Sequence, residues 1–334
     1  KSNTKNHRIM KSVLLISNQH PNENGIGNPI MYRMEQALLR NKRVSKVKFV
    51  PFFNNLKSLW RIRHTASDFD IIHIHFGGLY ALIIRIILIG IAKPMFITFH
   101  GTDIHAKSLQ SAKSRLLRWK IILNQKASFM SIRLFDRCGF VSESMLDYIP
   151  QNIKKKYNHK FFIQSLGVDY NTFTISSKEK AQDDLHIPRG KYILFSDVSN
   201  SSIKRRDLAE AIVAHLGTHY KLLVMCGVKP SDVPTYINAS DLVLLTSDEE
   251  GSPNIIREAL ALNKPFFSVK VGDAAKQLEG LENSTIISRN PIEAANTIKE
   301  YMSKEYVDFT RTKLQDVLDF NIINERIIDL YEQI

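Results

Sequence analysis

Residues 242–258 read Leu-Val-Leu-Leu-Thr-Ser-Asp-Glu-Glu-Gly-Ser-Pro-Asn-Ile-Ile-Arg-Glu, and this stretch decides the fold. Its apolar beginning predicts a buried strand over Leu242–Leu245. Ser252 is a favourable N-cap and Pro253 a favourable first helical residue, so we expect a helix over Pro253–Leu262. A strand followed at once by a helix is the repeating unit of a parallel α/β sheet.

Two glutamates flank the start of the expected helix. Glu250 lies in the preceding loop and Glu258 in the early turns. The segment Ser252, Pro253, Asn254 and Ile255 lies at the positive end of the helix dipole, which suits a phosphate group. An ionised carboxylate accepts two hydrogen bonds at once and suits sugar hydroxyls. The stretch therefore predicts a site for phosphate and sugar groups; the alternative is an ordinary capped helix with a surface glutamate.

This segment resembles the signature of the retaining nucleotide-sugar glycosyltransferases of family 4, which have the GT-B fold. The family motif is Glu-Gly-x-Pro followed by Glu-Ala, then a strand that opens with Pro, then a glycine loop. Here these features are residues 250–253, Glu258-Ala259, the strand after Lys264-Pro265, and Gly272. The resemblance implies an α/β protein with two Rossmann-like doubly wound domains that face each other across a cleft.

Strand and helix patterns alternate through both halves of the chain, which itself favours parallel sheets. Gly167-Val168-Asp169, with Phe173, resembles the interdomain segment of the family. We therefore expect an N-terminal acceptor- and membrane-side domain over 1–168, a C-terminal nucleotide-sugar-binding domain over 169–316, and a terminal helix in 317–334 that packs back on the first domain. The expected strands are Ser12–Ser17, Val47–Pro51, Ile71–His75, Met95–His100, Gly139–Ser142, Tyr192–Ser196, Lys221–Cys226, Leu242–Leu245, Phe266–Val269 and Thr285–Ile287.

The resemblance also implies roles for residues at strand ends, where open α/β sheets bind ligands. His100, in a His-Gly-x-Asp element, would position the donor sugar. Glu250 would hold sugar hydroxyls and Glu258 the ribose diol. Gly25 and Gly27, in the loop after the first strand, would lie beside the donor phosphates. Val228 would lie at the edge of the base site.

Lys204 matches the lysine that neutralises the departing nucleotide diphosphate in this family. Many members carry an additional arginine just after the preceding strand, and Ser196-Asp197-Val198 occupies that place here. Arg205 is the candidate substitute, or the site relies on one cation. Asp103 is expected to cap the next helix, and the alternative is a contact with the acceptor.

The reaction implied by the resemblance is that of a metal-independent hexosyltransferase. The acceptor would attack on the face from which the phosphate leaves, so that the anomeric configuration is retained. Asp68-Phe69-Asp70 has the form of a metal-binding motif but leads into a strand, and His73 and His75 lack a third ligand at suitable spacing. We therefore expect no metal site and no cofactor beyond the donor substrate, with a UDP-sugar preferred to a GDP-sugar.

Charge is divided unevenly along the chain. Residues 1–168 hold 27 Lys or Arg against 8 Asp or Glu, a net of +19, whereas the remainder has a net of −6. Eight cations lie between Lys107 and Arg137 and are interleaved with apolar residues such as Trp119. This pattern predicts an amphipathic basic helix at an anionic membrane surface. The longest apolar stretch, Leu79–Ala92, is too short to span a bilayer.

These observations favour a glycosyltransferase that builds a lipopolysaccharide, capsule or related cell-surface polysaccharide on a lipid-linked or glycan acceptor. Two widely spaced cysteines and the lack of a visible secretory signal place it in the cytoplasm, peripheral on the inner face of the cytoplasmic membrane. One alternative is a GT-B enzyme with a soluble acceptor or a nucleotide-sugar epimerase. Another is a basic nucleic-acid-binding protein, although no nucleic-acid motif is present and no nucleic-acid partner is expected.

Overall fold

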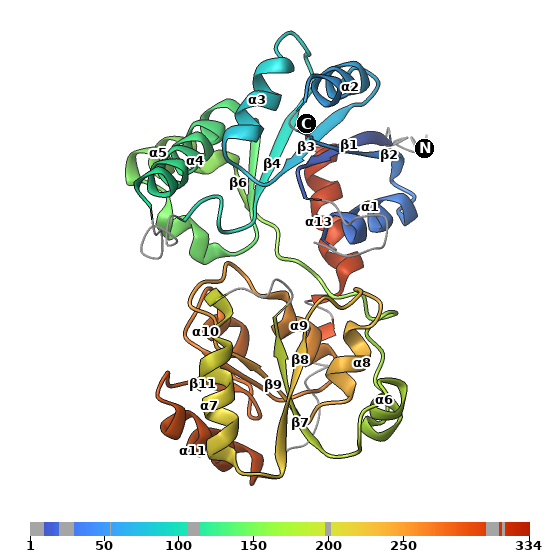
Figure 1. The fold of residues 1–334 in the computed structure, drawn as a ribbon. Helices are drawn as coiled ribbons and strands as arrows, with labels where there is room; N and C mark the ends of the chain where they lie inside the picture. Colours follow the sequence, from blue (N-terminus) through green and yellow to red (C-terminus); the bar gives the residue numbers. More distant parts are fainter. Residues whose placement is uncertain are drawn as a thin grey trace, which may run out of the picture.

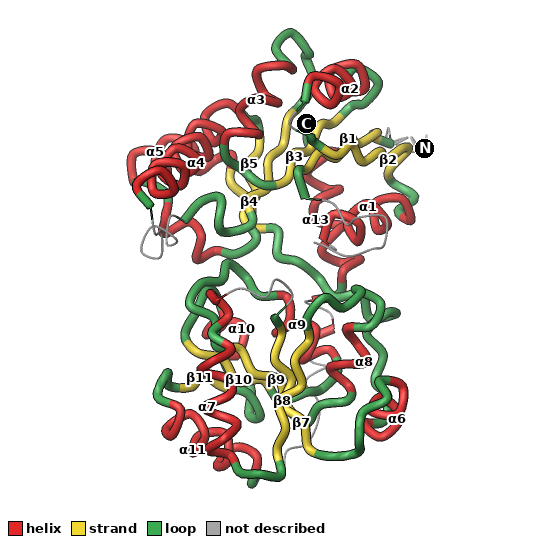
Figure 2. Tube along the Cα trace, viewed as in Figure 1, coloured by secondary structure: helices red, strands yellow, loops and turns green. Residues whose placement is uncertain are grey.

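The computed structural model describes residues 10–19, 30–53, 55–105, 114–197, 202–304, 314–315 and 318–334. The chain forms two α/β domains, each built around a parallel sheet flanked by helices (Figures 1 and 2). The predicted fold class, two Rossmann-like domains that face each other, is confirmed.

The N-terminal domain has a six-stranded sheet in the order β2-β1-β3-β4-β5-β6. Its strands are β1 (Lys11–Ser17), β2 (Val44–Pro51), β3 (Ile71–His75), β4 (Met95–Phe99), β5 (Arg137–Phe140) and β6 (Phe161–Ile163). Its helices are α1 (Ile30–Arg40), α2 (Leu56–Ala66), α3 (Leu79–Ile87), α4 (Arg115–Leu134) and α5 (Gln151–Tyr157).

The C-terminal domain has a five-stranded sheet in the order β11-β10-β9-β7-β8. Its strands are β7 (Lys191–Ser196), β8 (Tyr220–Met225), β9 (Leu242–Leu245), β10 (Phe266–Val269) and β11 (Thr285–Ile287). Its helices are α6 (Lys178–Asp184), α7 (Arg206–Leu216), α8 (Val233–Asn238), α9 (Asn254–Ala261), α10 (Ala274–Leu278) and α11 (Pro291–Met302), and the final helix α13 spans Phe320–Glu332.

Each sheet has a separate apolar core, because its central strands are buried on both faces. The final helix, α13, contributes Ile327, Ile328 and Tyr331 to the core of the N-terminal domain. Arg43, in the turn just before β2, binds three carboxylates on α13, those of Glu325, Asp329 and Glu332. The C-terminal end of the chain is therefore part of the N-terminal domain, on the side of the sheet that carries α1 (Figure 1).

Two chain segments connect the domains side by side. Val168 and Asp319 form an isolated parallel bridge, in which the Val168 amide donates to the Leu318 carbonyl and the Phe320 amide donates to the Val168 carbonyl. A Cβ on Gly167 would lie 2.5 Å from the Phe320 Cα, so the close approach of the two segments requires glycine there.

Three details differ from the expectations. Phe161–Ile163, absent from the expected strands, forms β6, an edge strand paired with β5. A helix is expected over Ala112–Asn124, and the basic helix α4 instead spans Arg115–Leu134, because Ala127, Ser128, Ser131 and Ile132 are buried in its second half. The helix after β9 begins at Asn254, with Pro253 in the N-cap position.

Strand order reverses direction beside β1 in the first sheet and beside β7 in the second. In parallel sheets, ligands bind outside the carboxyl ends of the strands at such switch points. The loop that follows β4 of one domain meets the loop that follows β9 of the other, where Gly101 lies against Gly251. This junction contains the candidate site.

Candidate functional site

A cavity of about 190 Å³ lies between the domains and gathers most of the residues expected in the site. Both signature glutamates and the expected lysine line it, together with three residues at the start of α9 and Val228 after β8. Six further residues, among them Arg33 of α1, complete the lining. The complete lining consists of Arg33, Ser196, Lys204, Met225, Val228, Pro230, Val233, Leu245, Glu250, Pro253, Asn254, Ile255 and Glu258.

Lys204 is held in place by the loop that follows β9. The Thr246 hydroxyl lies 2.9 Å from the carbonyl oxygens of both Lys204 and Arg205, and the Asp248 amide donates to the Ile203 carbonyl at 2.8 Å. Arg205 has a left-handed backbone, with φ of 54°, which ends the short 3₁₀ turn Ser202–Lys204 and starts α7. Hydrogen bonds to the loop after β9 therefore fix the turn that carries Lys204.

Lys204 and Glu250 form an ion pair inside the cavity, with Nζ and Oε1 2.6 Å apart. The Ser247 hydroxyl donates to the same Glu250 oxygen at 2.8 Å. An ammonium group has three donors, so this pair leaves Lys204 with donors for a phosphate and leaves Oε2 of Glu250 for a hydroxyl. The arrangement suits a ligand that carries both groups.

The start of α9 supplies backbone donors to the same cavity. Pro253 occupies the N-cap position and has no N–H, so the free amides of the first turn begin at Asn254 and Ile255. Ser252, expected as the N-cap, instead donates its hydroxyl to Asp273 at 2.8 Å and accepts from the Arg257 guanidinium. The serine thus fixes the loop against the start of α10 rather than capping the helix.

Arg33 of α1 reaches across the junction and binds Glu258, with Nη1 and Oε1 2.9 Å apart. Both side chains are largely buried, at 15% and 10% exposure. Nothing in the sequence singles out Arg33, because it lies on a helix surface with no motif around it. Only the packing of the two domains reveals that it belongs to the site.

The turn that follows β4 lies directly against the Glu250-Gly251 turn of the other domain. A Cβ on Gly251 would lie 2.8 Å from the His100 carbonyl oxygen, and a Cβ on Gly272 would lie 2.6 Å from the Gly251 carbonyl oxygen. Gly101, at φ of 126°, approaches Gly251 from the other side. These three glycines bring His100 beside the cavity, although its side chain is not among those that line it.

The Asp103 carboxylate shapes this turn. It accepts hydrogen bonds from the amides of Gly77, His100 and Gly101 and so joins the loops after β3 and β4. The expectation that Asp103 caps a helix is therefore wrong, because backbone amides of two loops occupy its oxygens. Phe76, the first residue after β3, has φ of 67°, which is strained for a bulky residue. Its ring stacks on that of His100, with the ring centres 4.1 Å apart.

Behind the turn, three histidines form a buried chain. His73 bonds to the Tyr331 hydroxyl at 2.5 Å and to Thr98 at 2.8 Å, and the His75 Nδ1 lies 3.1 Å from the His100 Nε2. Burial lowers the pKa of His73 and of His100 to about 3 and holds the pKa of His75 well below its ordinary value. All three rings are therefore neutral at physiological pH.

These neutral histidines predict a loss of stability in mild acid. Below pH ~6.5 these histidines bind protons in the unfolded chain but stay neutral in the folded chain. The free energy of unfolding therefore falls as the pH drops from ~6.5 toward 3. Each ring contributes a slope of about 1.4 kcal/mol per pH unit to the free energy of unfolding. Urea unfolding of wild type and His73→Gln between pH 7 and 4 measures this slope. A variant slope as steep as that of wild type would contradict the assignment.

The remaining site candidates lie elsewhere. Arg205 points away from the cavity and binds Asp207 and Asp248. Gly25 and Gly27 lie outside the described residues. Asp70 accepts hydrogen bonds from the backbone and hydroxyl of Ser12. Across the described ranges, no cluster of three or more His, Cys, Asp or Glu residues is placed to hold a metal ion.

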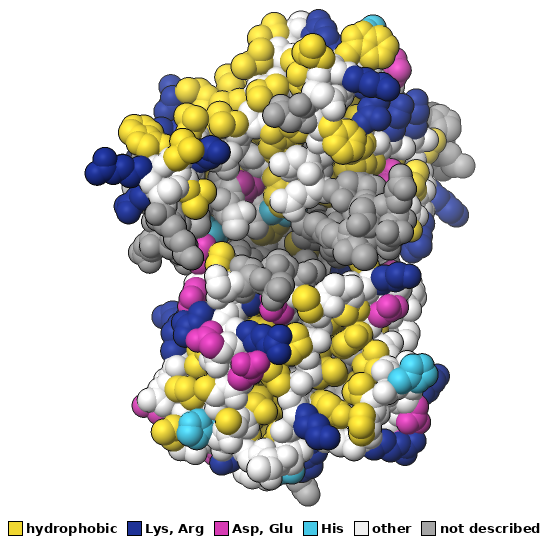
Figure 3. Space-filling model, viewed as in Figure 1, with side chains coloured by type: hydrophobic (Ala, Val, Ile, Leu, Met, Phe, Trp, Pro, Cys, Tyr) yellow, Lys and Arg dark blue, Asp and Glu magenta, His cyan; other side chains and the backbone are white. Residues whose placement is uncertain are grey.

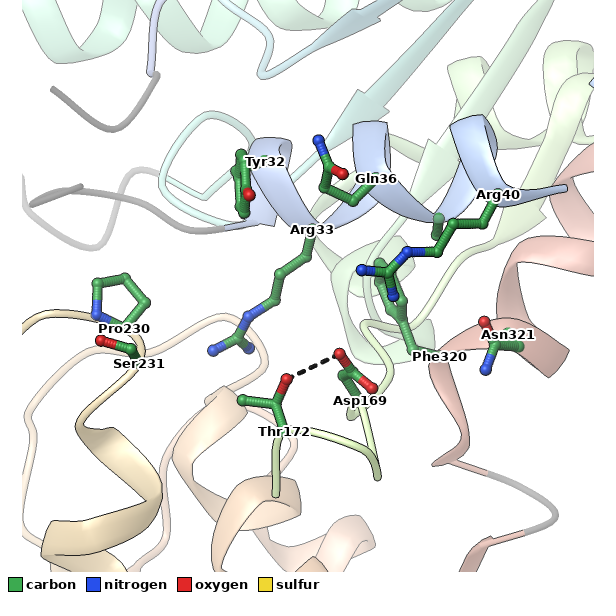
Figure 4. A pocket seen from close by; sticks show the side chains of 11 residues that line it. Tyr32, Arg33, Gln36, Arg40, Asp169, Thr172, Pro230, Ser231, Phe320 and Asn321 are labelled. Atoms are coloured by element: carbon green, nitrogen blue, oxygen red, sulfur yellow. Dashed lines mark hydrogen bonds between the residues drawn. The ribbon is translucent and has the colours of Figure 1, made fainter. Parts of the chain in front are cut away.

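A second cavity, of about 280 Å³, adjoins the first and shares Arg33 and Pro230 with it. Figure 4 shows Arg33 and Arg40 projecting from α1 toward the segment that holds Asp169 and Thr172, in which the Thr172 hydroxyl donates to the Asp169 carboxylate. The two cavities together form a continuous interdomain region with α1 on one side and the C-terminal domain on the other.

Comparison with protein families identifies two matches that follow each other along the chain. Residues 20–170 match Glycosyltransferase Family 4, and residues 202–316 match Glycosyl transferases group 1. None of the curated proteins matches the sequence.

Solved structures share the whole architecture. Sucrose-phosphate synthase from Thermosynechococcus elongatus superposes with a TM-score of 0.71 at 13% identity, covering 97% of this chain and 98% of that one. Anabaena HepE in complex with UDP-glucose gives 0.72 at 14% identity, covering 96% and 100%. A glycosyltransferase from Rickettsia africae gives 0.69 at 14% identity, covering 97% and 98%. At these identities the likeness concerns the fold.

Proposed function

Because this chain belongs to the family 4 and group 1 glycosyltransferases with the GT-B fold, we propose that it transfers a hexose from a nucleotide-diphosphate sugar to a glycan or lipid-linked acceptor. The observation that carries this proposal is the interdomain cavity, which combines Lys204, the α9 amides and two carboxylates. We propose that the nucleotide is UDP. This proposal is supported by the structure of Anabaena HepE, which has the same fold and was solved in complex with UDP-glucose.

The cavity divides naturally into subsites for the parts of such a donor. Glu258 suits the ribose diol, because a carboxylate accepts two hydrogen bonds in one plane. Lys204 and the amides of Asn254 and Ile255 suit the diphosphate. Glu250, whose carboxylate is anchored by Lys204 and Ser247, suits the hydroxyls of the donor sugar. Val228, Pro230 and Val233 provide an apolar edge for the base.

Catalysis in this proposal consists of stabilising the leaving group. As the glycosidic bond breaks, negative charge accumulates on the diphosphate, where Lys204 and the α9 amides already point. The acceptor hydroxyl attacks from the same face and passes its proton to the departing phosphate oxygen, which retains the anomeric configuration. No metal takes part in this scheme, because the lysine and the helix amides supply the positive charge.

Binding of the donor is the first test of the proposal. We expect UDP and UDP-sugars to raise the melting temperature of the wild type without added metal, because a ligand that binds only the folded state stabilises it. Glu258→Ala should weaken UDP binding by roughly 10- to 100-fold through the loss of charge-assisted hydrogen bonds to ribose. Thermal shifts with UDP-, GDP-, ADP- and dTDP-sugars measure this.

The matched control is Glu282→Ala, which removes a carboxylate of the C-terminal domain outside the cavity. A wild type that responds to no nucleotide, with or without magnesium, would contradict the donor site. Conversion of the donor into a different sugar without acceptor would favour the epimerase.

We also propose that the N-terminal domain binds an anionic membrane surface on the cytoplasmic side, where a lipopolysaccharide, capsule or related acceptor is elongated. Hydrophobic side chains gather over α2 and α3 at the top of Figure 3 and are bordered by Lys and Arg. Trp60 is 65% exposed, Ile86 61% and Trp119 70%. Exposed apolar patches of this kind mark interaction surfaces. Of the helices that the structure describes, none has both the length and the apolar character of a membrane span.

The α4 helix contributes both the apolar and the basic part of this surface. Leu116, Trp119 and Leu123 recur at helical spacing and are exposed, while Arg115 and Lys126 flank them. Lys107 and Lys113, expected in the same basic run, lie outside the described residues. Aromatic and aliphatic residues that insert at the interface, with cations that contact anionic headgroups, are the features of a peripheral membrane helix.

We expect the wild type to cosediment with vesicles of phosphatidylglycerol and phosphatidylcholine but not of phosphatidylcholine alone. The double variant Leu116→Glu/Trp119→Glu should lower vesicle affinity by roughly 100-fold or more, because it removes buried apolar area and adds two repelled charges. Ile292→Glu, at an exposed apolar position on α11, is the control. Equal binding of the double variant and the control would contradict membrane docking through α4.

A further inference from the structure

Among the residues that the structure describes, the cavity proposed for the donor contains one cation beyond Lys204, and it comes from the opposite domain. The family resemblance implies an arginine just after β7 in many members, and Ser196 and the buried Asp197 occupy that place here. Arg205, the candidate substitute, is turned outward and bound to Asp207 and Asp248. We propose that Arg33 of α1 fills this role as a second diphosphate-binding cation, an inference that rests on the proposed donor site.

The position of Arg33 is fixed from two sides. Its Nη1 binds Oε1 of Glu258 at 2.9 Å, and its guanidinium carbon lies 5.4 Å from the centre of the Phe173 ring. Figure 4 shows the side chain extending from α1 toward the C-terminal domain. A guanidinium that lies over an aromatic face and is paired with a carboxylate is oriented before a ligand binds, so little conformational entropy is lost on binding.

Arg33 keeps donors for a ligand. A guanidinium has five N–H groups in a fixed fork, and in the described part of the chain Glu258 accepts one of them. The side chain lines the same cavity as Lys204 and the first residues of α9. Planar bidentate binding to phosphate is the geometry for which arginine is best suited.

Pairing with Glu258 does not block the proposed ribose site. Arg33 uses Oε1 of the carboxylate, and Oε2 stays available for a ribose hydroxyl. Ribose and diphosphate are adjacent in every nucleotide sugar, so one guanidinium next to Glu258 is also next to the first phosphate. The Arg33–Glu258 pair is therefore expected to lie where the ribose is joined to the first phosphate.

The origin of Arg33 in the N-terminal domain places the proposed diphosphate between the two domains. A diphosphate held by Arg33 from one side and by Lys204 from the other bridges the two domains. Such a ligand would join the two domains at the point where the Arg33–Glu258 ion pair already joins them.

The test compares UDP with uridine, which has the base and ribose but no phosphate; if the nucleotide panel selects another base, its diphosphate and nucleoside replace them. Arg33→Ala is expected to weaken UDP binding by roughly 10- to 100-fold, and to weaken it at least about tenfold more than uridine binding. Arg33→Lys should recover part of the loss, because it restores the charge without the fork. Arg40→Ala, on the same face of α1 but outside the donor cavity, is the control. Isothermal titration for UDP and ligand-observed NMR for uridine supply the constants.

Three results would overturn the proposal. UDP affinity of Arg33→Ala equal to that of Arg40→Ala would show that Arg33 does not contact the ligand. Equal losses for UDP and uridine would mean that Arg33 acts only by orienting Glu258. A folded Arg33→Lys that binds UDP no better than Arg33→Ala would show that the positive charge is not what matters. Failure of the wild type to bind any nucleotide would instead overturn the donor site itself.

Discussion

Lys204→Ala is expected to lower kcat by roughly 10²- to 10³-fold, the usual effect of removing one preorganised group that stabilises developing negative charge. Lys204 is on a turn fixed by Thr246 and is aimed by its 2.6 Å ion pair with Glu250. Because the charge on the diphosphate grows as the glycosidic bond breaks, the loss should be larger in kcat than in donor affinity. Release of UDP from UDP-sugar, with acceptor or with water, provides the measurement.

Arg206→Ala is the matched control for Lys204→Ala. Arg206 lies two residues away, is exposed, and binds Glu210 on α7 rather than the cavity. Its variant should retain the wild-type rate. A Lys204→Ala enzyme with the kcat of this control would remove the lysine from the mechanism and leave Arg33 and the α9 amides to stabilise the leaving group.

The second large effect is expected from Gly251→Ala. The new Cβ would lie 2.8 Å from the backbone oxygen of His100 and 3.2 Å from the Gly101 Cα, and neither neighbour is a flexible side-chain end. The two domains must then separate at the turn that carries Glu250. A displacement of about 1 Å of reacting groups costs roughly 100-fold in rate, so kcat/KM should fall by about that factor.

The melting temperature distinguishes this effect from unfolding. Gly251 contacts the other domain and not either core, so each domain should remain folded and the melting temperature should change little. Gly190→Ala is the control, because its Cβ would meet nothing closer than 3.6 Å. Full activity of Gly251→Ala would show that close contact between the turns of His100 and Glu250 is not needed for turnover.

The fold was predictable because its signals are local. Leu242–Leu245 and Ile71–His75 are short apolar runs bounded by polar loops, and both form strands with the expected limits. The edge strand Phe161–Ile163 was missed because it is half-exposed and short, which resembles a linker in sequence. The start of α9 was placed one residue early, because the Ser252 hydroxyl has stronger partners in Asp273 and Arg257 than the helix amides.

The candidate site was predictable only where it follows a strand or opens a helix. Lys204, Glu250 and Glu258 are near such points, and the structure brings them to one cavity. Arg33 is outside this logic: α1 presents Arg33, Gln36 and Arg40 on one face, and no local pattern says which of them meets the other domain. Its role depends on how the two domains pack against each other, and no short segment of sequence determines that packing.

The most direct test of the donor site is a crystal structure of this protein with bound UDP. We expect the ribose on Glu258, the diphosphate between Lys204, Arg33 and the first amides of α9, and the base along Val228 and Pro230. Nucleotide found in the neighbouring cavity of Arg40 and Asn321, with Lys204 still bound only to Glu250, would contradict the account.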